Sequence, residues 1–342
     1  MKRRLAILVW AGLLLLVVGG GMFAAVGAHG TQRPEGDDQP AGELPNPVYY
    51  QDQVIVLMYH DVSQTPLNDK SLTVDRFSEQ LKLMKEAGFN WITMEQYVNF
   101  MLHGGRVPNN AVLLTFDDGY ASFYQYAYPL LRQYQAPATS FLIVSTVGNP
   151  KAKGVPKLNW DQVQEMHQNG ISFYSHTYNS HMEFPVAKNG KRIRGVLAAP
   201  LYMNINGEKR VETHEEYLAR ITKDLDKANQ VLAVKLGNRL KVIAFPYGDF
   251  SKDLLQVCHQ LGMDVTFTVK RGINGPEDRN GYRVNAGGMS DDPAELIADM
   301  KKAIPKAVTT DCLSWAGSTG RKASNGKELK ACHWGLLGPA FP

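Results

Sequence analysis

Cysteine is scarce in this sequence. Its 342 residues include three cysteines, Cys258, Cys312 and Cys332. None of them has the paired C-x-x-C spacing typical of a structural zinc knuckle. In an exported protein, Cys312 and Cys332 could form a disulfide near the C-terminus, which would leave Cys258 as a small buried residue on a helix.

The sequence also lacks a strong charge imbalance and any internal repeat. Its formal net charge is +4, and outside residues 1–30 there are 34 basic and 33 acidic residues. Such a balance provides no strong attraction to nucleic acid, so we expect no nucleic-acid partner. With 44% hydrophobic and 20% charged residues, most of the chain has the composition of an ordinary globular protein.

The N-terminus differs from the rest of the chain. Lys2, Arg3 and Arg4 precede residues 5–28, which contain no charged side chain. A basic start followed by an apolar stretch is typical of an export signal, and 24 uncharged residues could also span a bilayer. Residues 1–30 are therefore predicted to be a cleaved signal peptide or an N-terminal membrane anchor. Residues 31–49, rich in proline, glycine and charge, are predicted to be a linker. Either alternative places the remainder outside the cytoplasm, in the extracellular space or at the cell surface.

Apolar strands alternate with amphipathic helices from residue 50 to residue 305. Residues 54–59 and 111–114 are apolar runs typical of buried parallel strands. Repeated strand–helix units predict an α/β fold, and about seven units in this length favour a distorted (β/α) barrel over an open sheet. Residues 306–342 show weak periodicity and have no assigned structure.

Residues 182–212 interrupt this alternation and are predicted to be an insertion. The Asn189-Gly190 and Asn206-Gly207 pairs indicate one or two hairpins. The apolar run 196–203 lies between them. We favour its packing on the body of the domain, and the alternative is an exposed run that contacts a partner or a membrane.

The segment Thr115–Tyr120 places two adjacent carboxylates, Asp117 and Asp118, after a buried strand. Enzymes with α/β folds build their sites at the carboxyl ends of such strands. Gly119 provides a bend, because glycine tolerates positive φ at little cost. A solvated turn with a helix cap is the simpler interpretation of an isolated Asp-Asp-Gly.

Three other predicted strands also end in polar residues. His60 follows the first, His176 and His181 follow another, and Pro246–Gly248 follows a third. In a parallel barrel these ends would meet at one rim. One aspartate with two histidines is a ligand set for a catalytic divalent metal. The histidines are five residues apart and would have to converge from a loop, because this spacing does not align them on one helix face.

These segments together resemble the polysaccharide deacetylases of carbohydrate esterase family four, the NodB-type domain. The resemblance rests on Thr115–Tyr120, Ser175–Thr177 with His181, and Phe245–Gly248, and it covers roughly residues 50–305. His60, within Met58–Val62, lies before the aspartates. That order is similar to the circularly permuted branch of poly-β-1,6-N-acetyl-D-glucosamine N-deacetylases.

The resemblance implies roles for individual residues. Asp118, His176 and His181 would be metal ligands, Asp117 the catalytic base and His60 the catalytic acid. The metal would be zinc, with cobalt, nickel or iron as alternatives. The backbone N–H of Tyr120 would stabilise the oxyanion, and Tyr120, Tyr247 and Trp160 would contact substrate. His60 could instead cap its loop, and Tyr247 could be a packing residue.

The sequence departs from the family pattern in one respect that matters for the chemistry. Common members carry an arginine before the Pro-x-Gly motif that tethers the base aspartate, whereas residues 244–247 contain none. We therefore expect Asp117 to be untethered and the activity to be modest. Trp160-Asp161 is the nearest equivalent of another family motif, and it equally suits an ordinary helix start.

The function that the resemblance implies is removal of N-acetyl groups from a poly-β-1,6-N-acetyl-D-glucosamine exopolysaccharide of the biofilm matrix, with release of acetate. The alternatives are a peptidoglycan or chitin-type deacetylase, and a glycan-binding protein with a degenerate site. We expect a monomer whose partner is an N-acetylglucosamine polymer.

Overall fold

A sheet of nine parallel strands organises the part of the chain that this computed structural model describes, residues 47–66, 71–288 and 292–306. The strand order is β14-β13-β12-β7-β6-β5-β1-β15, and β4 pairs with β5 beside this path. The bounds are β1 (Val54–Tyr59), β4 (Asn90–Trp91), β5 (Ala111–Phe116), β6 (Ala138–Leu142), β7 (Ile171–Ser175), β12 (Val242–Ala244), β13 (Val265–Phe267), β14 (Asn280–Gly281) and β15 (Val284–Asn285).

The sheet curls into an open half-barrel, which confirms the predicted barrel-like α/β fold. Its two ends are β14 and β15, which do not pair with each other within the described residues. Only Tyr282 and Arg283 lie between these two strands in the sequence. The chain therefore crosses the gap directly. The nine strands exceed the predicted number of about seven because β14 and β15, each only two residues long, give no periodic pattern.

Helices alternate with the strands, as predicted. They are α1 (Val74–Glu86), α2 (Met94–His103), α3 (Tyr128–Tyr134), α4 (Trp160–Gln168), α5 (His214–Leu236), α6 (Lys252–Gln260) and α7 (Pro293–Lys301). Capping boxes begin three of them, with Thr93, Asn159 and Thr213 as N-caps. These side chains satisfy backbone donors that a helix start leaves free. The helical segment over residues 121–134 contains a π-helical turn, η1 (Phe123–Ala127), directly before α3.

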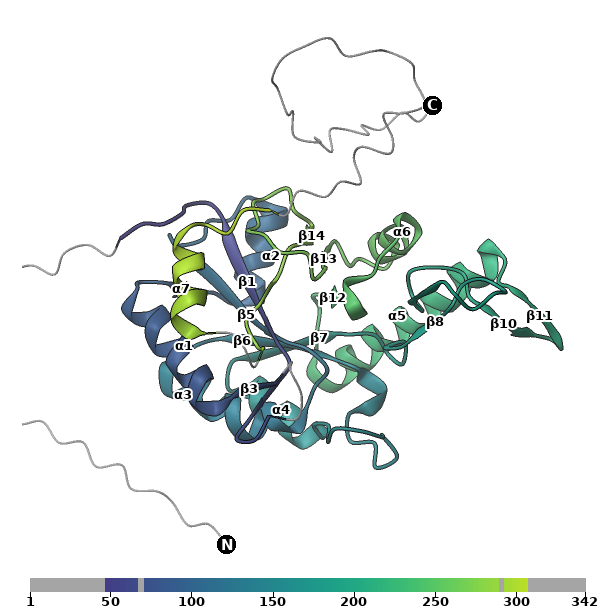
Figure 1. The fold of residues 1–342 in the computed structure, drawn as a ribbon, viewed down its shortest axis with the longest axis horizontal. Coiled ribbons are helices and arrows are strands. Elements are labelled where there is room, and N and C mark those ends of the chain that lie inside the picture. The colour runs from purple at the N-terminus through teal and green to yellow at the C-terminus, as the bar shows by residue number, and fades with distance from the viewer. Residues whose placement is uncertain (1–46, 67–70, 289–291, 307–342) are drawn as a thin grey trace, which may run out of the picture. The chain divides into compact units, whose positions relative to one another are not determined.

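Alternation along the strands separates two apolar layers. Val112 and Leu114 of β5 face the outer cluster, which α1, α3, α4 and α7 cover, whereas Ala111 and Leu113 face the barrel interior. A third cluster lies between β12 and helices α5 and α6. Figure 1 shows α1, α3 and α7 beside β1 and β5 towards one end of the curled sheet, and α5 and α6 beside β7 and β12 towards the other end. Two short strands, β2 (Asp61–Ser63) and β3 (Ser71–Thr73), pair beside the end of β1.

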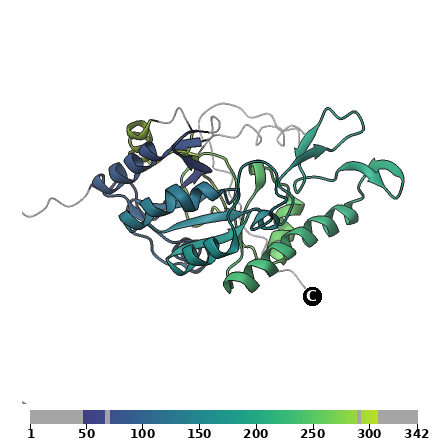
Figure 2. The ribbon, with the colours of Figure 1, turned by 90° about the horizontal axis from the view of Figure 1, so that it is seen from below.

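The inserted segment forms two hairpins that extend from the body (Figures 1 and 2). They are β8 (Glu183–Pro185) with β9 (Ile193–Gly195), and β10 (Tyr202–Ile205) with β11 (Glu208–Val211). Asn206 and Gly207 have φ values of 52° and 89°, as a tight two-residue hairpin turn requires. The hairpins predicted from the Asn-Gly pairs are therefore confirmed.

The apolar run 196–203 packs on the body of the domain. Val196, Leu197 and Ala198 are 2–3% exposed. The Tyr217 hydroxyl donates to the Leu197 carbonyl at 2.8 Å, and Arg220 donates to the Val196 carbonyl at 2.7 Å. The favoured packing of the run on the domain is therefore confirmed, and the alternative of an exposed run is wrong, because the apolar side chains at its start are buried against α5.

Several predictions fall on residues 1–46 and 307–342, outside the described part of the chain. These are the signal or anchor, most of the linker, the tail and the Cys312–Cys332 disulfide. Cys258 is a buried free cysteine on α6, as predicted. In the described ranges, no helix has both the length and the apolar character needed to cross a bilayer.

Candidate functional site

The predicted site residues gather at the carboxyl ends of neighbouring strands. Asp117 and Asp118 follow β5, and His176 follows β7. The strand ladders continue into these residues, because the Asp117 N–H donates to the Tyr59 carbonyl at 2.9 Å and the His176 N–H to the Leu142 carbonyl at 2.8 Å. Parallel pairing of β1, β5, β6 and β7 thus fixes the backbone from which the chemical groups project.

Asp118, His176 and His181 form a cluster that could hold a metal ion. Their ligand atoms all lie within 4.8 Å of one another. Asp118 Oδ1 is 3.5 Å from His176 Nε2 and 3.2 Å from His181 Nε2. The same oxygen is buried and has no hydrogen-bond donor. A buried carboxylate oxygen without a donor is costly, so the donor set suits a cation placed between the three side chains.

His176 is held in the form that can bind a metal. Its Nδ1 lies 2.8 Å from the Ala244 carbonyl oxygen. A carbonyl only accepts, so Nδ1 carries the proton and the Nε2 lone pair faces Asp118. Burial, opposed by the nearby aspartates, lowers the pKa of His176 to about 4. The imidazole is therefore neutral at physiological pH.

A tight loop returns His181 to His176, which the five-residue spacing alone does not guarantee. Thr177 has a φ of 81°, in the left-handed region, and its hydroxyl accepts from the Ser180 N–H at 3.0 Å. The Asp224 carboxylate of α5 accepts from the N–H groups of residues 178 and 179, each at 2.9 Å. This loop brings the centroids of the His176 and His181 rings to 4.8 Å from each other.

Asp117 is tethered by an arginine that the sequence analysis missed. Arg283 Nη1 donates to Asp117 Oδ1 at 2.7 Å, and both side chains are almost fully buried. Arg283 Nε donates to the Thr268 carbonyl at 3.0 Å. The prediction of an untethered Asp117 is therefore wrong, because the arginine comes from between β14 and β15 instead of from the segment before Pro246. The pattern Asn280–Asn285 carries no motif that would have identified it.

The Asp117 carboxyl stays ionised despite its burial. Burial alone would raise its pKa, but the Arg283 guanidinium, with smaller contributions from His176 and His60, holds the pKa of Asp117 well below its ordinary value. The pKa of Asp118 is likewise lowered, because His176, His181 and Lys157 outweigh its burial. Both aspartates are therefore anions at neutral pH.

Three further predicted residues lie at this site. His60 is near enough to both aspartates to make a small contribution to their lowered pKa values. Burial, together with the neighbouring Asp118 carboxylate, raises the pKa of the Tyr120 phenol. The Tyr247 ring lies 4.9 Å from the ring of His181, and its hydroxyl lies 3.5 Å from His181 Nδ1.

Trp160 is not brought into the cluster. Its ring packs beside Gly148 and lies 5.5 Å from the Lys235 ammonium. No contact joins it to Asp118, His176 or His181 in the part of the chain that the structure describes. Its position at the start of α4, after the N-cap Asn159, agrees with the simpler interpretation of Trp160-Asp161 as a helix start.

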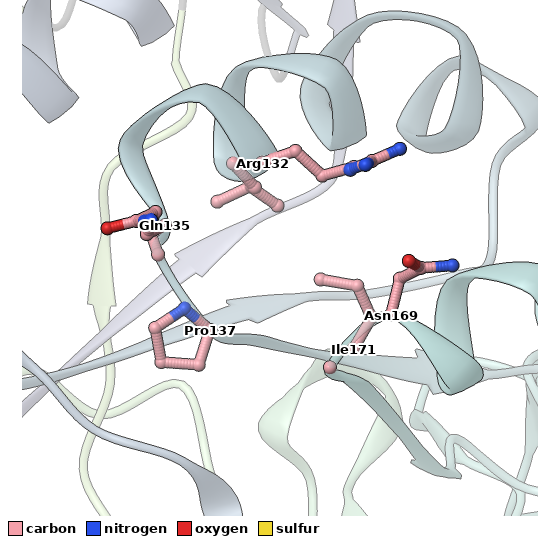
Figure 3. A pocket seen from close by; sticks show the side chains of 8 residues that line it. Arg132, Gln135, Pro137, Asn169 and Ile171 are labelled. Atoms are coloured by element: carbon pink, nitrogen blue, oxygen red, sulfur yellow. The ribbon is translucent and has the colours of Figure 1, made fainter. Parts of the chain in front are cut away.

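A hollow of about 290 Å³ lies at the opposite ends of the same strands. Figure 3 shows Arg132, Gln135, Pro137, Asn169 and Ile171 around it. These residues precede or begin β6 and β7, whereas the metal-binding cluster follows the ends of β5 and β7. The hollow and the chemical groups are thus separate features.

Residues 104–266 match the sequence pattern of the family described as "Polysaccharide deacetylase". This range contains both aspartates and both histidines of the cluster. Residues 104–266 therefore form a polysaccharide deacetylase domain. His60 lies before the matched range and Arg283 lies after it, so the family pattern by itself covers neither residue.

Relatives and solved structures agree with this family. The chain is 28% identical over 261 residues to a poly-β-1,6-N-acetyl-D-glucosamine N-deacetylase of Escherichia coli K12, with 72% of this chain but only 36% of that protein covered. The protein of the same name from Staphylococcus aureus MRSA252 is 26% identical over 310 residues, which cover 86% of this chain and 95% of that protein. A de-N-acetylase structure from Aggregatibacter actinomycetemcomitans has a TM-score of 0.62 at 26% identity, and the match covers 68% of this chain and 94% of that one.

Proposed function

We propose that this polysaccharide deacetylase hydrolyses N-acetyl groups of poly-β-1,6-N-acetyl-D-glucosamine, releasing acetate and leaving free amines on the polymer. The observation that carries the proposal is the Asp118, His176 and His181 cluster beside a second buried, ionised aspartate. The linkage is proposed from the names of the relatives. Peptidoglycan or chitin-type substrates are the alternative within the same reaction class.

The donor set fits a divalent metal, and zinc is our proposal because two imidazoles and one carboxylate suit it. A bound zinc ion would polarise the amide carbonyl and lower the pKa of a water molecule to about 7. Asp118 supplies the negative charge of the site, and His176 supplies a lone pair already aligned by Ala244. His181 completes the set from the loop after β7.

Asp117 is proposed as the general base. Arg283 occupies its Oδ1, which leaves Oδ2 to accept the proton of the attacking water. Since the tether holds the carboxylate rigidly, the base need not reorganise during the reaction. The tethered carboxylate also removes the reason for expecting modest activity.

His60 and the Tyr120 backbone are proposed to complete the reaction. His60 would protonate the departing amine. Its position supports this role, because it directly follows β1, whose last residue Tyr59 pairs with Phe116 next to Asp117. The Tyr120 N–H would donate to the oxyanion. This N–H makes no hydrogen bond to another backbone group in the described chain, whereas the next one, that of Ala121, donates to the Pro156 carbonyl. The Tyr120 N–H is therefore free of backbone partners and could bind the oxyanion.

Tyr247 is proposed as a platform for a sugar ring. It is 44% exposed although it follows a buried strand, and its ring contacts a proposed metal ligand. Its φ of 60° is uncommon for a residue other than glycine, and backbone strain of this kind is concentrated at functional sites. Trp160, which lies apart from the cluster, is left out of this proposal.

Export is a further proposal, supported by the uncharged residues 5–28 after a basic start. An extracellular or surface location would bring the enzyme to an exopolysaccharide. Fractionation of cells that produce the full chain would test it, and recovery of the protein only from the cytoplasm would contradict it.

Two substitutions test the division of roles at the site. Asp118→Ala is expected to lose zinc and activity, since it removes the only anionic member of the cluster. Asp117→Asn is expected to keep zinc while kcat falls by about 10³-fold or more, because an amide cannot accept the proton. Zinc content and acetate release are measured on the same preparations. Normal turnover by Asp117→Asn would overturn the base assignment, and zinc binding without turnover in the unaltered protein would favour a glycan-binding protein.

A further inference from the structure

The turn that carries the two aspartates is clamped by the segment that precedes α4. The N–H of Ala121 donates to the Pro156 carbonyl at 2.9 Å, and the N–H of Leu158 donates to the Gly119 carbonyl at 3.0 Å. Between these two bonds, Tyr120 and Lys157 form an antiparallel bridge. This is the non-hydrogen-bonded kind of pair, in which the two side chains lie close together on one face.

Lys157 extends along this face to the peptide of Asp118. Its Nζ lies 3.9 Å from the centroid of the Tyr120 ring and donates to the Asp118 carbonyl at 2.9 Å. The ring attracts and orients the ammonium group. One lysine thus connects the aromatic residue after the turn with the backbone of a proposed metal ligand.

The Asp118 peptide needs such support. Asp118 has a φ of 73°, a left-handed conformation that is uncommon for any residue other than glycine. Conformations of this kind persist only where the surroundings enforce them. Gly119 follows with a φ of 65°, and a Cβ there would lie 2.7 Å from the Leu142 side chain. The rotation at Asp118 therefore sets where its carboxylate points relative to His176 and His181.

We propose that Lys157 is a positioning residue that fixes the left-handed turn and so preorganises Asp118 for the metal. The proposal rests on the assignment of Asp118 as a ligand under the proposed function. It assigns Lys157 no contact with the reacting atoms. Groups that orient a metal ligand typically alter metal affinity by about 10- to 100-fold when they are removed.

A purely electrostatic role for Lys157 would have the opposite sign. An ammonium group near the cluster repels a divalent cation, so removal of its charge alone would tighten metal binding. Loss of the hydrogen bond to Asp118 would weaken metal binding, because the carboxylate would no longer be held towards the histidines. The direction of the change in affinity therefore separates the two roles.

The experiment compares full-length Lys157→Met, Lys157→Arg and Lys235→Met with the unaltered chain. Methionine keeps the apolar stem and removes both the charge and the donor. Arginine keeps both. Lys235 is a matched control, because its ammonium also lies over an aromatic ring, that of Trp160, but makes no contact with Asp118. Zn²⁺ affinity is measured by competition with a chromophoric chelator, and Co²⁺ loading provides an absorption spectrum of the coordination geometry.

Lys157→Met is expected to bind Zn²⁺ at least tenfold more weakly and to change the Co²⁺ spectrum. Lys157→Arg and Lys235→Met are expected to stay within threefold of the unaltered chain. Unchanged or tighter Zn²⁺ binding by Lys157→Met, with an unchanged Co²⁺ spectrum, would overturn the proposal. If Lys157→Met does not fold, Lys157→Leu, which also removes both the charge and the donor, carries the same expectation. Asp118→Ala, measured in parallel, reports on the site itself: undiminished Zn²⁺ binding by that variant would refute the ligand assignment rather than the role of Lys157.

Discussion

Asp117 is a buried carboxylate whose charge depends on one guanidinium group. Removal of that group by Arg283→Met leaves the almost fully buried anion without its main partner. The pKa of Asp117 should then rise, because burial is no longer opposed by Arg283. We expect the acid limb of the kcat/KM profile to move to higher pH by at least one unit.

The same substitution should lower the free energy of unfolding by about 3–5 kcal/mol at neutral pH, since it breaks a buried ion pair. The direction in which the Asp117 contribution to stability changes with pH follows from its lowered pKa. The stabilisation by Asp117 is present above the pKa of about 3.9 of the unfolded chain and is lost as pH falls through the lower folded value. Arg271→Met is the matched control, because its Asp299 partner is exposed and such pairs contribute under about 1 kcal/mol. Equal losses in the two variants, from chemical denaturation, would contradict this account.

The lowered pKa of His176 should make the stability of the metal-free protein depend on pH. Its folded pKa of about 4 lies below the value of about 6.5 for an unfolded histidine. The unfolded chain therefore takes up the proton first as the pH falls from 6.5 to 4. The free energy of unfolding should fall across this window, by up to about 1.4 kcal/mol per pH unit. Chemical denaturation of the unaltered protein and of His176→Gln, both metal-free, should give curves that diverge below pH 6.5, and parallel curves would refute the prediction.

At the scale of elements, the hairpin of β8 and β9 is joined to the site by a carboxylate. Asp249 accepts from Arg194 Nε at 2.7 Å and from the Gly195 N–H at 3.0 Å. Asp249 lies two residues after Tyr247, and β8 begins two residues after His181. The contacts of Asp249 with Arg194 and Gly195 therefore connect the two loops that carry the proposed sugar platform and a proposed metal ligand.

Arg194→Met tests whether this hairpin contributes to the site. We expect kcat/KM to fall about tenfold, because small displacements of aligned groups are costly in rate. The free energy of unfolding should change by about 1 kcal/mol or less, since the pair is partly exposed. Arg210→Met is the control, because Arg210 pairs with Glu216 at the start of α5 and not with a site loop. Equal activity of the two variants would show that the hairpin is independent of catalysis.

The elements that could be predicted from sequence are those whose signals are local. The apolar run before Asp117, the Asn-Gly turns of the insertion and the polar strand ends all depend on neighbouring residues, and each was identified. Arg283 could not be found in this way. It meets Asp117 across 166 residues, and it lies in a stretch where the strands are too short to give a periodic pattern. The π-helical turn of η1 could not be predicted either, because its residues have the composition of an ordinary helix.

At the scale of the whole molecule, the site depends on both ends of the described chain. β1, which precedes His60, pairs with β5 on one side and with β15 on the other. The gap between β14 and β15 is crossed by the residues that include Arg283. The proposed acid and the tether of the base thus come from the first and last parts of the sheet, while the metal-binding cluster comes from its centre. The open half-barrel allows this arrangement, because β14 and β15 do not pair and the segment between them can place Arg283 at the site.

The most direct test of the central claim is acetate release from β-1,6-linked N-acetylglucosamine oligomers, measured beside β-1,4-linked oligomers with zinc-loaded protein beginning at residue 31. The account predicts release from the β-1,6 substrate only, its loss on chelation and its return when zinc is restored. Release from the β-1,4 oligomers alone would contradict the proposed substrate. The absence of release from either, with zinc bound, would contradict the proposed reaction.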